Sequence, residues 1–600
     1  MKLSDYVFQF LASQGVKHVF MFPGGGAMHL VDSLGRNKKL TYICNHHEQA
    51  CAIAAEAYAR VTNNLGVALV TTGPGGTNAI TGVAGAWLDS TPCLFISGQV
   101  KRSDLVLDKG VRQLGVQEID IVSLVSPITK YSITVMDPTD IRFHLEKAVY
   151  LAKSGRPGPV WIDIPLDVQA SDIEVKKLKG FISIDTEQTA DQKTLNNQMK
   201  EMINLLNESK RPVVLAGNGV RLAEAQKEFI KLVDILNVPI LTTRLGVDLI
   251  PAKNKLYFGM PGSIAARGAN FTLQNSDLLI ILGARLDYAL IAYAPEKLAR
   301  AAKKVMINID PAEIRKIKSI IDLPIATDAK DFINGIIGQK ELIKKKDRSS
   351  WINRCREWMI KYPFVLPEHY KTKSAVSVYA FSDTLSDILD KNYIILPGSS
   401  GNACELFLTA FRVKKGQRVF HNKGTGAMGL SQPTAIGACL ASGQKPTVCI
   451  DGDGGFQLNI QELETVRRLN LPIKFFVMNN HGYASIRASQ SGYFGRLTGA
   501  DQTSGLTLPD IVKVAKAYNL ATARISSQAN LRQKIERVLA LAGPVVCEVK
   551  IIPDEIRTPR VSSMQRPDGS MVSKPLEDMW PFLDRKEFLA NMIIQPSKED

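Results

Sequence analysis

Short runs of β-branched and apolar residues recur along this chain, and most of them end close to a glycine. The first group of runs lies at 19–22, 66–73, 93–98 and 160–165. Two further groups follow, at 211–220, 238–243, 277–285 and 305–310, and then at 393–398, 446–454, 473–480 and 544–550. Segments with helical periodicity separate the runs. This alternation predicts parallel β-sheets that are covered by helices.

The distribution of these runs predicts three domains and a tail. We expect an α/β fold of three doubly wound parallel-sheet domains at 1–170, 185–340 and 370–555, followed by a C-terminal lid and tail at 556–600. The polar stretch at 170–195 and the Lys- and Asp-rich stretch at 340–372 are the expected linkers. In open α/β sheets, ligands bind at the carboxyl ends of strands, where the glycines of this chain collect.

Composition restricts the class of protein. The chain has 600 residues, of which 45% are hydrophobic and 22% charged, as in a globular protein. Its formal net charge of +16 would suit a polyanion, but the Lys and Arg residues are scattered and accompany no nucleic-acid module. The eight cysteines form no CxxC pair, and no segment has the length of a membrane span. We therefore expect a cytoplasmic protein with no nucleic-acid or membrane partner.

The segment at 450–483, IDGDGGFQLNIQELETVRRLNLPIKFFVMNNHGY, places polar residues at the ends of two successive strands. Asp453 follows the first strand and Asn480 ends the second, and neighbouring parallel strands would bring both to one sheet edge. Such hard oxygen ligands suit Mg²⁺. Gly454 and Gly455 would let a diphosphate approach the backbone and a helix N-terminus. An ordinary βα turn would explain either end alone.

Glu48 stands behind His46 and His47 at the start of an apolar helix. A carboxylate in a first helical turn is favoured by the helix dipole without any chemistry. A zinc site of the HExxH type would need a second histidine at position 51, which is a cysteine. The third interpretation is a carboxylate in an apolar pocket that exchanges a proton with a ligand.

The 450–483 segment resembles the GDG…NN signature of thiamine diphosphate enzymes, with the Asp-to-Asn spacing of the acetolactate synthase group. Further stretches resemble the same family in order, at 19–34, 46–49, 71–82, 88–100, 155–165 and 424–438. The resemblance covers nearly the whole chain. It implies that the three domains bind, in order, the pyrimidine of thiamine diphosphate, a flavin, and the diphosphate with Mg²⁺.

The resemblance also implies roles for single residues. Glu48 would hydrogen-bond N1′ of the aminopyrimidine, and Met428 would hold the two cofactor rings bent toward each other. Mg²⁺ would be bound by Asp453, Asn480 and Gly482. Gly25 and Gln117 would lie beside the reacting carbons. The other contacts expected for thiamine diphosphate are Pro74, Asn78, Ser399, Ser400, Gly401, Asn402, Gly426, Gly454 and Gly455.

In the acetolactate synthase family the central domain holds FAD, which does no net redox chemistry. The matching positions here are Gly217, Asn218, Gly219, Gly259, Met260, Gly283, Ala284, Arg285, Asp287 and Asp310. Two residues depart from the family pattern, because Pro261 replaces a histidine and Ala289 replaces an arginine. The matching positions nevertheless lead us to expect FAD. The alternative is that these are ordinary strand-end turns of a domain that has lost the cofactor.

The resemblance implies a decarboxylating carboligase that takes a 2-oxo acid, with pyruvate the expected donor, and joins its two-carbon unit to a second carbonyl compound. The alternatives are a simple 2-oxo acid decarboxylase, an aldehyde lyase, or a non-catalytic scaffold that binds the cofactor. Glu48 and the metal motif lie in different domains. In the family, the two domains that form one active site come from different subunits. A homodimer or homotetramer with sites at the interface is therefore expected, and the need for a regulatory subunit is left open.

Three departures from the family concern the acceptor. Ser489 stands where the family has a large tryptophan over the substrate channel, and the loop before Gln117 is longer than expected, with Val116 replacing a phenylalanine. The C-terminus continues through 557–583. We therefore expect room for an acceptor as large as a nucleotide-linked keto sugar, with family drift on solvated loops as the alternative. The arginines that could meet its anionic group are Arg487, Arg557, Arg560 and Arg566.

Overall fold

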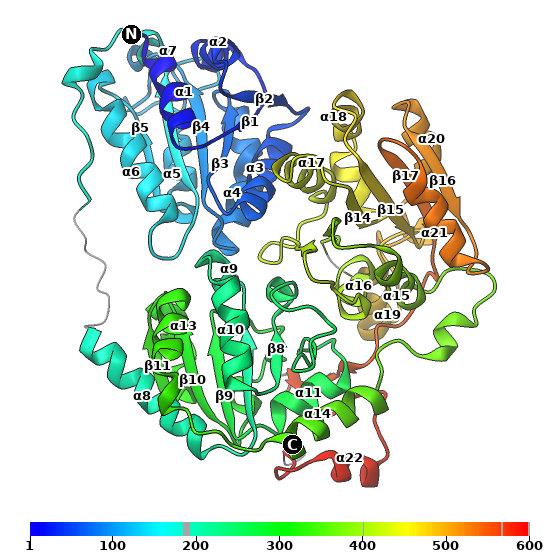
Figure 1. Ribbon diagram of the computed structural model, residues 1–600. Coiled ribbons are helices and arrows are strands. Elements are labelled where there is room, and N and C mark those ends of the chain that lie inside the picture. The colour runs from blue at the N-terminus through cyan, green and yellow to red at the C-terminus, as the bar shows by residue number, and fades with distance from the viewer. Residues whose placement is uncertain (108, 184–191, 400, 566–567, 570, 598–600) are drawn as a thin grey trace.

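The computed structural model describes residues 1–107, 109–183, 192–399, 401–565, 568–569 and 571–597. The chain folds into three α/β units, each built on one parallel sheet with helices on its faces (Figure 1). The predicted fold class is therefore confirmed. The residue boundaries of the domains stay a prediction.

The first sheet has the strand order β2-β1-β3-β4-β6-β5. Its strands are β1 His18–Met21, β2 Thr41–Cys44, β3 Gly66–Val70, β4 Cys93–Gln99, β5 Tyr131–Thr134 and β6 Val160–Pro165. The helices of this unit are α1 Leu3–Ser13, α2 Met28–Arg36, α3 Glu48–Thr62, α4 Pro74–Leu88, α5 Ile121–Val125, α6 Ile141–Lys153 and α7 Leu166–Ala170. The central strands β3, β4 and β6 are fully buried, which explains their unbroken apolar sequences.

The middle sheet has the order β11-β10-β9-β7-β8. Its strands are β7 Pro212–Ala216, β8 Ile240–Thr242, β9 Leu278–Leu282, β10 Lys303–Asn308 and β11 Leu323–Ala326. The helices are α8 Gln192–Glu208, α9 Gly219–Leu222, α10 Gln226–Leu236, α11 Arg267–Gln274, α12 Pro311–Arg315, α13 Ala329–Gly338 and α14 Ser349–Lys361. Helix α14 lies inside the stretch predicted as the second linker. Its Trp351, Cys355 and Trp358 belong to the core of the middle domain, so this part of the linker prediction is wrong.

The third sheet has the order β13-β12-β14-β15-β17-β16. Its strands are β12 Ile394–Leu396, β13 Arg418–Val419, β14 Thr447–Gly452, β15 Ile473–Asn479, β16 Ala521–Ile525 and β17 Val545–Lys550. The helices are α15 Val378–Ile388, α16 Glu405–Ala410, α17 Ser431–Ala441, α18 Glu462–Arg468, α19 Ala484–Phe494, α20 Ile511–Ala517 and α21 Leu531–Ala540. As the sequence predicts, β14 and β15 are hydrogen-bonded neighbours, and a 3₁₀ turn at Gly455–Asn459 precedes the helix that follows β14.

Helices α3 and α17 join the first and third domains, and they lie side by side in Figure 1. One continuous buried cluster contains alanines of α3 together with Ala435, Ile436 and Ala438 of α17. At Gly437 of α17 an added Cβ would lie 2.1 Å from the carbonyl oxygen of Ala54. The two backbones therefore approach as closely as glycine permits, and α3 is fixed by a domain that is distant in sequence.

The C-terminal segment leaves the third domain and returns to the middle domain, where Figure 1 shows α22 Arg585–Asn591 below α14. Along this path lie β18 Arg560–Val561, β19 Ser563–Gln565, β20 Met571–Ser573 and β21 Met579–Trp580. The buried Arg267 donates to the carbonyl oxygen of Met579 at 3.0 Å, and Asn270 donates to that of Leu576 at 2.8 Å. The tail is therefore part of the middle domain's packing.

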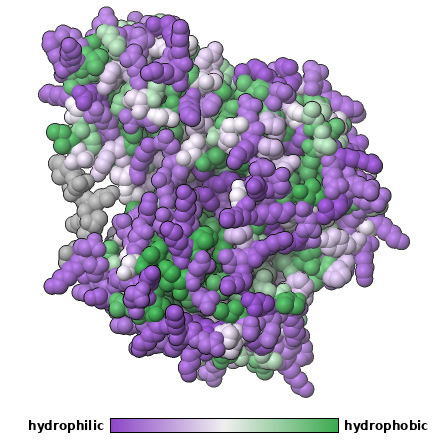
Figure 2. Space-filling model, viewed as in Figure 1, coloured by the Kyte–Doolittle hydropathy of each residue, from purple (hydrophilic) through white to green (hydrophobic). Residues whose placement is uncertain are grey.

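Within the described ranges, every helix is too short or too polar to cross a bilayer. Hydrophilic side chains cover most of the face shown in Figure 2, with a hydrophobic area over the middle domain. All eight cysteines are free thiols, and seven of them are buried. The cytoplasmic localisation stays a prediction.

Replacing Gly437 by alanine tests the close approach of α3 and α17. The new methyl group would meet backbone rather than a movable side chain, so we expect the free energy of unfolding to fall by about 1–3 kcal/mol. The matched control is Gly35→Ala in α2, because no atom lies within 4 Å of that Cβ position. There the same change should stabilise by up to about 1 kcal/mol. Equal urea unfolding midpoints for the two variants would contradict the packing argument.

Candidate active site

Glu48 is the first residue of α3, and its side chain is buried. The Asn78 side chain donates to Glu48 Oε2 at 3.0 Å. An added Cβ at Gly75 would lie 3.7 Å from Oε1, so the glycine at the start of α4 leaves space beside this oxygen. Among the described residues, Glu48 forms no ion pair. This is a carboxylate with one anchored oxygen and one oxygen that can take a ligand.

The turn before Glu48 is held by residues of the third domain. Glu462 accepts hydrogen bonds from the Asn45 side chain at 2.8 Å and from the His46 backbone N–H at 2.7 Å. Asn459 donates to the Gln49 side chain at 2.8 Å. Sequence reasoning missed Glu462, because an acid at a helix start is favoured by the dipole and carries no signal of its own. Its two bonds fix the position at which α3 begins.

The three residues predicted to bind the metal converge. Asp453 is buried, and its Oδ2 accepts from the Gly482 backbone N–H at 3.0 Å. One side-chain amide atom of Asn480 lies 3.2 Å from Asp453 Oδ1 and 2.6 Å from the Gly482 carbonyl oxygen. If that atom is nitrogen, it donates to both; if it is oxygen, three oxygens meet as they would around a cation. With the amide oxygen turned toward Asp453 and Gly482, the three oxygens form a donor set that fits Mg²⁺.

Burial raises the pKa values of two aspartates near the predicted diphosphate loop. It raises the pKa of Asp453 to about 6 and the pKa of Asp451 to about 7. Within the described residues, Asp451 Oδ2 and the buried Asn402 Nδ2 have no hydrogen-bond partner. Asn402 lines the same cavity as Asn480, so its free amide donor suits a bound diphosphate.

The remaining predicted contacts of the diphosphate domain lie around this loop. An added Cβ at Gly454 would be 2.2 Å from the Tyr483 ring, and one at Gly455 would be 2.8 Å from Asp451 Oδ1. These glycines are therefore required by local packing as well as by any ligand. Gly401 is buried, Ser399 is half-buried, and Ser400 lies outside the described residues.

The residues predicted beside the reacting carbons are exposed within this chain. Gly25 has open space around its Cβ position. Gln117 has a φ of +64°, and its carbonyl oxygen would lie 2.1 Å from a Cβ at Gly73, which precedes Pro74. Met428 and Gly426 are half-buried in the loop that leads into α17. Their exposure leaves these residues available to a ligand or to a second subunit.

The chain brings these residues together in two separate groups. Glu48, Pro74 and Asn78 form one group on the first domain, and Asp453, Asn480 and Gly482 form the other on the third domain. In the part of the chain that the structure describes, no hydrogen bond or ion pair joins Glu48 to Asp453, Asn480 or Met428. Within the described residues, the two groups are therefore not joined by a direct polar contact.

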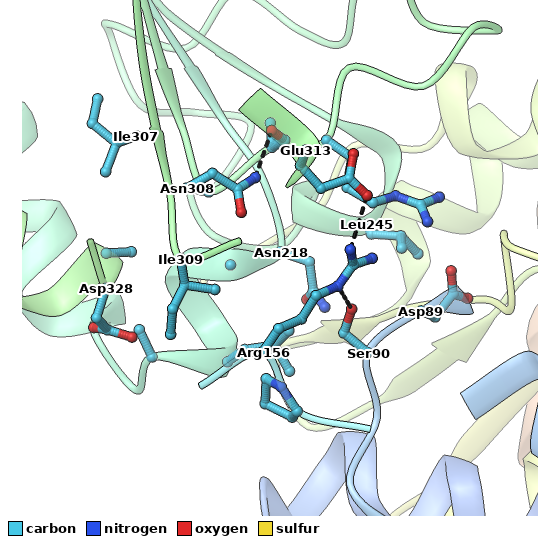
Figure 3. A pocket seen from close by; sticks show the side chains of 18 of the residues that line it. Asp89, Ser90, Arg156, Asn218, Leu245, Ile307, Asn308, Ile309, Glu313 and Asp328 are labelled. Atoms are coloured by element: carbon cyan, nitrogen blue, oxygen red, sulfur yellow. Dashed lines mark hydrogen bonds and ion pairs between the residues drawn. The ribbon is translucent and has the colours of Figure 1, made fainter. Parts of the chain in front are cut away.

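A cavity of about 380 Å³ lies between the first domain and the middle domain. Arg156 crosses it in Figure 3, donating to Ser90 Oγ at 2.8 Å and pairing with Glu313 at 2.9 Å. The predicted flavin residues that line it are Asn218, Gly219, Gly283, Ala284, Arg285 and Asp287. Its basic groups suit a diphosphate and its acids suit ribose hydroxyls, so the donor set fits a dinucleotide.

Other predicted flavin residues have a structural explanation. A Cβ at Gly217 would be 2.3 Å from the Gly283 carbonyl oxygen, so these glycines allow two strand ends to pack together. Met260 is buried against the core of the third domain, and neither it nor Gly259 lines the cavity. Asp310 caps α12 and pairs with Arg156 at 2.9 Å. The assignment of Gly259 and Met260 to a flavin pocket is therefore not supported by their positions.

Comparison with known proteins agrees with this arrangement. Three family models match the chain: the N-terminal TPP binding domain of thiamine pyrophosphate enzymes over residues 1–124, the central domain over 199–336, and the C-terminal TPP binding domain over 399–549. The acetolactate synthase large subunit of Cyanidium caldarium is 32% identical over 570 residues, which cover 92% of this chain and 93% of that protein.

Two further relatives span equally large parts of the chain. The probable acetolactate synthase large subunit of Methanocaldococcus jannaschii is 32% identical over 568 residues, covering 92% of this chain and 93% of the relative. Acetolactate synthase 2, chloroplastic, of Nicotiana tabacum is 32% identical over 579 residues, covering 94% of this chain and 84% of the relative. Similarity thus extends across all three sheets.

Replacing Glu462 by glutamine tests whether the third domain positions Glu48. An amide accepts through one oxygen only, so one buried donor loses its partner and the start of α3 shifts. We expect exchange of the C2 proton of bound thiamine diphosphate to slow by about tenfold to a hundredfold, with the protein still folded. Glu464→Gln is the control, because that carboxylate pairs with Arg467 on its own helix. Equal exchange rates in both variants would show that Glu462 does not position Glu48.

Proposed function

The chain belongs to the thiamine pyrophosphate enzyme family, and we propose that it is a carboligase of the acetolactate synthase type. It removes CO₂ from a 2-oxo acid, with pyruvate as the donor, and joins the remaining two-carbon unit to the carbonyl carbon of a second molecule. One C–C bond breaks, one forms, and the new alkoxide takes up a proton. The extent of similarity to acetolactate synthase large subunits supports this assignment.

Glu48 is the observation that carries the mechanism. When bound, thiamine diphosphate accepts the electron pair that is left when CO₂ departs. Glu48 would hold a proton against N1′ of the aminopyrimidine, with Asn78 orienting the carboxylate through Oε2. Because no cation neutralises Glu48, the carboxylate is available to exchange that proton. Met428 would support the bent arrangement of the two cofactor rings.

We assign Mg²⁺ to Asp453, Asn480 and the carbonyl oxygen of Gly482, whose convergence supports the site. The Asn402 amide and the backbone at Gly454 and Gly455 would then hold the diphosphate. Because Glu48 and this group lie on different domains without direct contact, a second copy of the chain would complete each site. A homodimer with two sites, or a dimer of such dimers, follows from that requirement.

The test of this function is product analysis with the protein loaded with thiamine diphosphate and Mg²⁺. Pyruvate should yield acetolactate and CO₂. Glu48→Gln should still bind the cofactor but lose exchange of its C2 proton and all product, because an amide cannot exchange a proton with N1′. Acetaldehyde as the main product would indicate a decarboxylase instead, and wild-type C2 exchange in Glu48→Gln would remove Glu48 from the mechanism.

We also propose that the cavity at Arg156 holds FAD. Its volume lies within the range of small-molecule sites, and Arg156, Lys153 and Arg285 supply positive charge for a diphosphate. Since the resemblance implies no net redox role, the flavin would act by joining the first and middle domains. Arg156 already links these domains through Asp310 and Glu313.

The purified protein should carry flavin absorbance that pyruvate does not bleach. Arg156→Ala should weaken FAD retention by about tenfold or more, since it removes a charge-assisted contact to the diphosphate. Arg354→Ala is the matched control, because this arginine lies on α14 and pairs with the exposed Glu357. A protein that stays colourless after incubation with FAD would show that the cavity has lost the cofactor.

A further inference from the structure

A second cavity, of about 650 Å³, begins at Asn402 and Asn480 and is walled by α19 and the C-terminal segment. Asn480 belongs to the proposed metal site, so the cavity opens directly beside the proposed cofactor diphosphate. A 2-oxo acid of three carbons would leave most of this volume empty. The helix α19 contributes Ala484, Ala488 and Ser491. The cavity therefore has room for a molecule much larger than pyruvate.

The extra space does not lie at Ser489, where the sequence predicts it. Ser489 is exposed and donates to the Ile486 carbonyl oxygen at 3.0 Å, and it does not line the cavity. The small residues that face the cavity are its neighbours on α19. The outer wall is formed by the segment from Pro553 to Arg560, together with Trp580.

Two of the three described arginines predicted to meet an anion are already neutralised. Arg487 is buried, pairs with Asp554 at 3.0 Å and donates to the carbonyl oxygens of Asn480 and Pro553. Arg557 pairs with Glu405 at 2.6 Å. These arginines shape the wall and cannot supply a free charge. Arg566 lies outside the described residues.

Arg560 is different. Its guanidinium lies over the ring of Trp580, 5.4 Å from the centroid, and forms no ion pair or hydrogen bond within the described part of the chain. The backbone of Arg560 is fixed from both sides, because it pairs with Trp580 in β21 and with Ile264 of the middle domain. A guanidinium held near an indole by a cation–π contact still has its N–H groups available to an anion.

We propose that this cavity is the acceptor site and that Arg560, supported by Trp580, binds a phosphate group of the acceptor. The inference rests on the proposed carboligase function. The acceptor would be a phosphorylated, hydroxylated carbonyl compound, because polar side chains of Gln502 and Thr503 line the same cavity and can bond hydroxyl groups. Planar guanidinium groups bind phosphate through two parallel hydrogen bonds. A sugar phosphate and a nucleotide-linked sugar share this chemistry.

Binding to the protein loaded with thiamine diphosphate and Mg²⁺ tests the proposal by calorimetry. The probes are glucose 1-phosphate and uridine diphosphate glucose, which have no free carbonyl and bind without turnover, with inorganic phosphate for comparison. We expect at least one sugar probe to bind the wild type at least tenfold more tightly than Arg560→Ala. Arg560→Lys should retain part of the affinity. Tighter binding of uridine diphosphate glucose than of glucose 1-phosphate would indicate that the acceptor is a nucleotide-linked sugar rather than a simple sugar phosphate.

Arg532→Ala is the matched control, because this exposed arginine pairs with Asp387 and Glu536 on the third domain and does not line the cavity. It should bind the probes as the wild type does. Equal affinity of Arg560→Ala and the wild type, or no binding of either sugar probe, would overturn the proposal. Release of CO₂ from pyruvate is measured in parallel, since its absence would instead refute the proposed function.

Discussion

The close approach of α3 and α17 is the constraint on which the rest of the structure depends. Gly437 lets the backbone of α17 touch that of α3, and the alanines of α3 merge the cores of the first and third domains. Glu462 then fixes the turn before Glu48 through two hydrogen bonds. The position of the carboxylate is thus set by the domain that holds the metal motif of the same chain, although the two groups do not meet within it.

Buried charges fix the domains relative to one another. Arg60 on α3 pairs with Asp89 at 2.6 Å and donates to the His421 carbonyl oxygen of the third domain. Asp248 of the middle domain pairs with Arg418 of the third domain at 2.7 Å. Removing one partner of such a pair leaves an unpaired buried charge, whereas a misplaced domain would leave several. These contacts therefore favour one domain arrangement over others, which a site divided between domains requires.

Sequence reasoning predicted what depends on pattern and missed what depends on tertiary contact. The buried central strands and the metal residues at the ends of β14 and β15 follow from apolar runs and strand-end chemistry. The edge strands β2 and β5 were missed, because both are only partly buried and have no apolar run to reveal them. Met260 was assigned to a flavin pocket but packs against the third domain. The predicted cofactor contacts rest on the family resemblance. Sequence reasoning named Arg560 among four candidate arginines, but its contact with Trp580 depends on tertiary structure and was not predicted.

The C-terminal segment ties the order of synthesis to the completion of the fold. The middle domain is made before the third, yet its buried Arg267 donates to the carbonyl oxygens of Met579 and Pro581, and its buried Asn270 donates to that of Leu576. Trp358 and Asn275 likewise bond Asn591. On the ribosome the middle domain must therefore wait, with polar groups uncovered, until about 200 further residues have been added. Until then the middle domain lacks contacts that the C-terminal segment supplies, so nonsense mutations near the 3′ end of the coding sequence would affect the domain translated second.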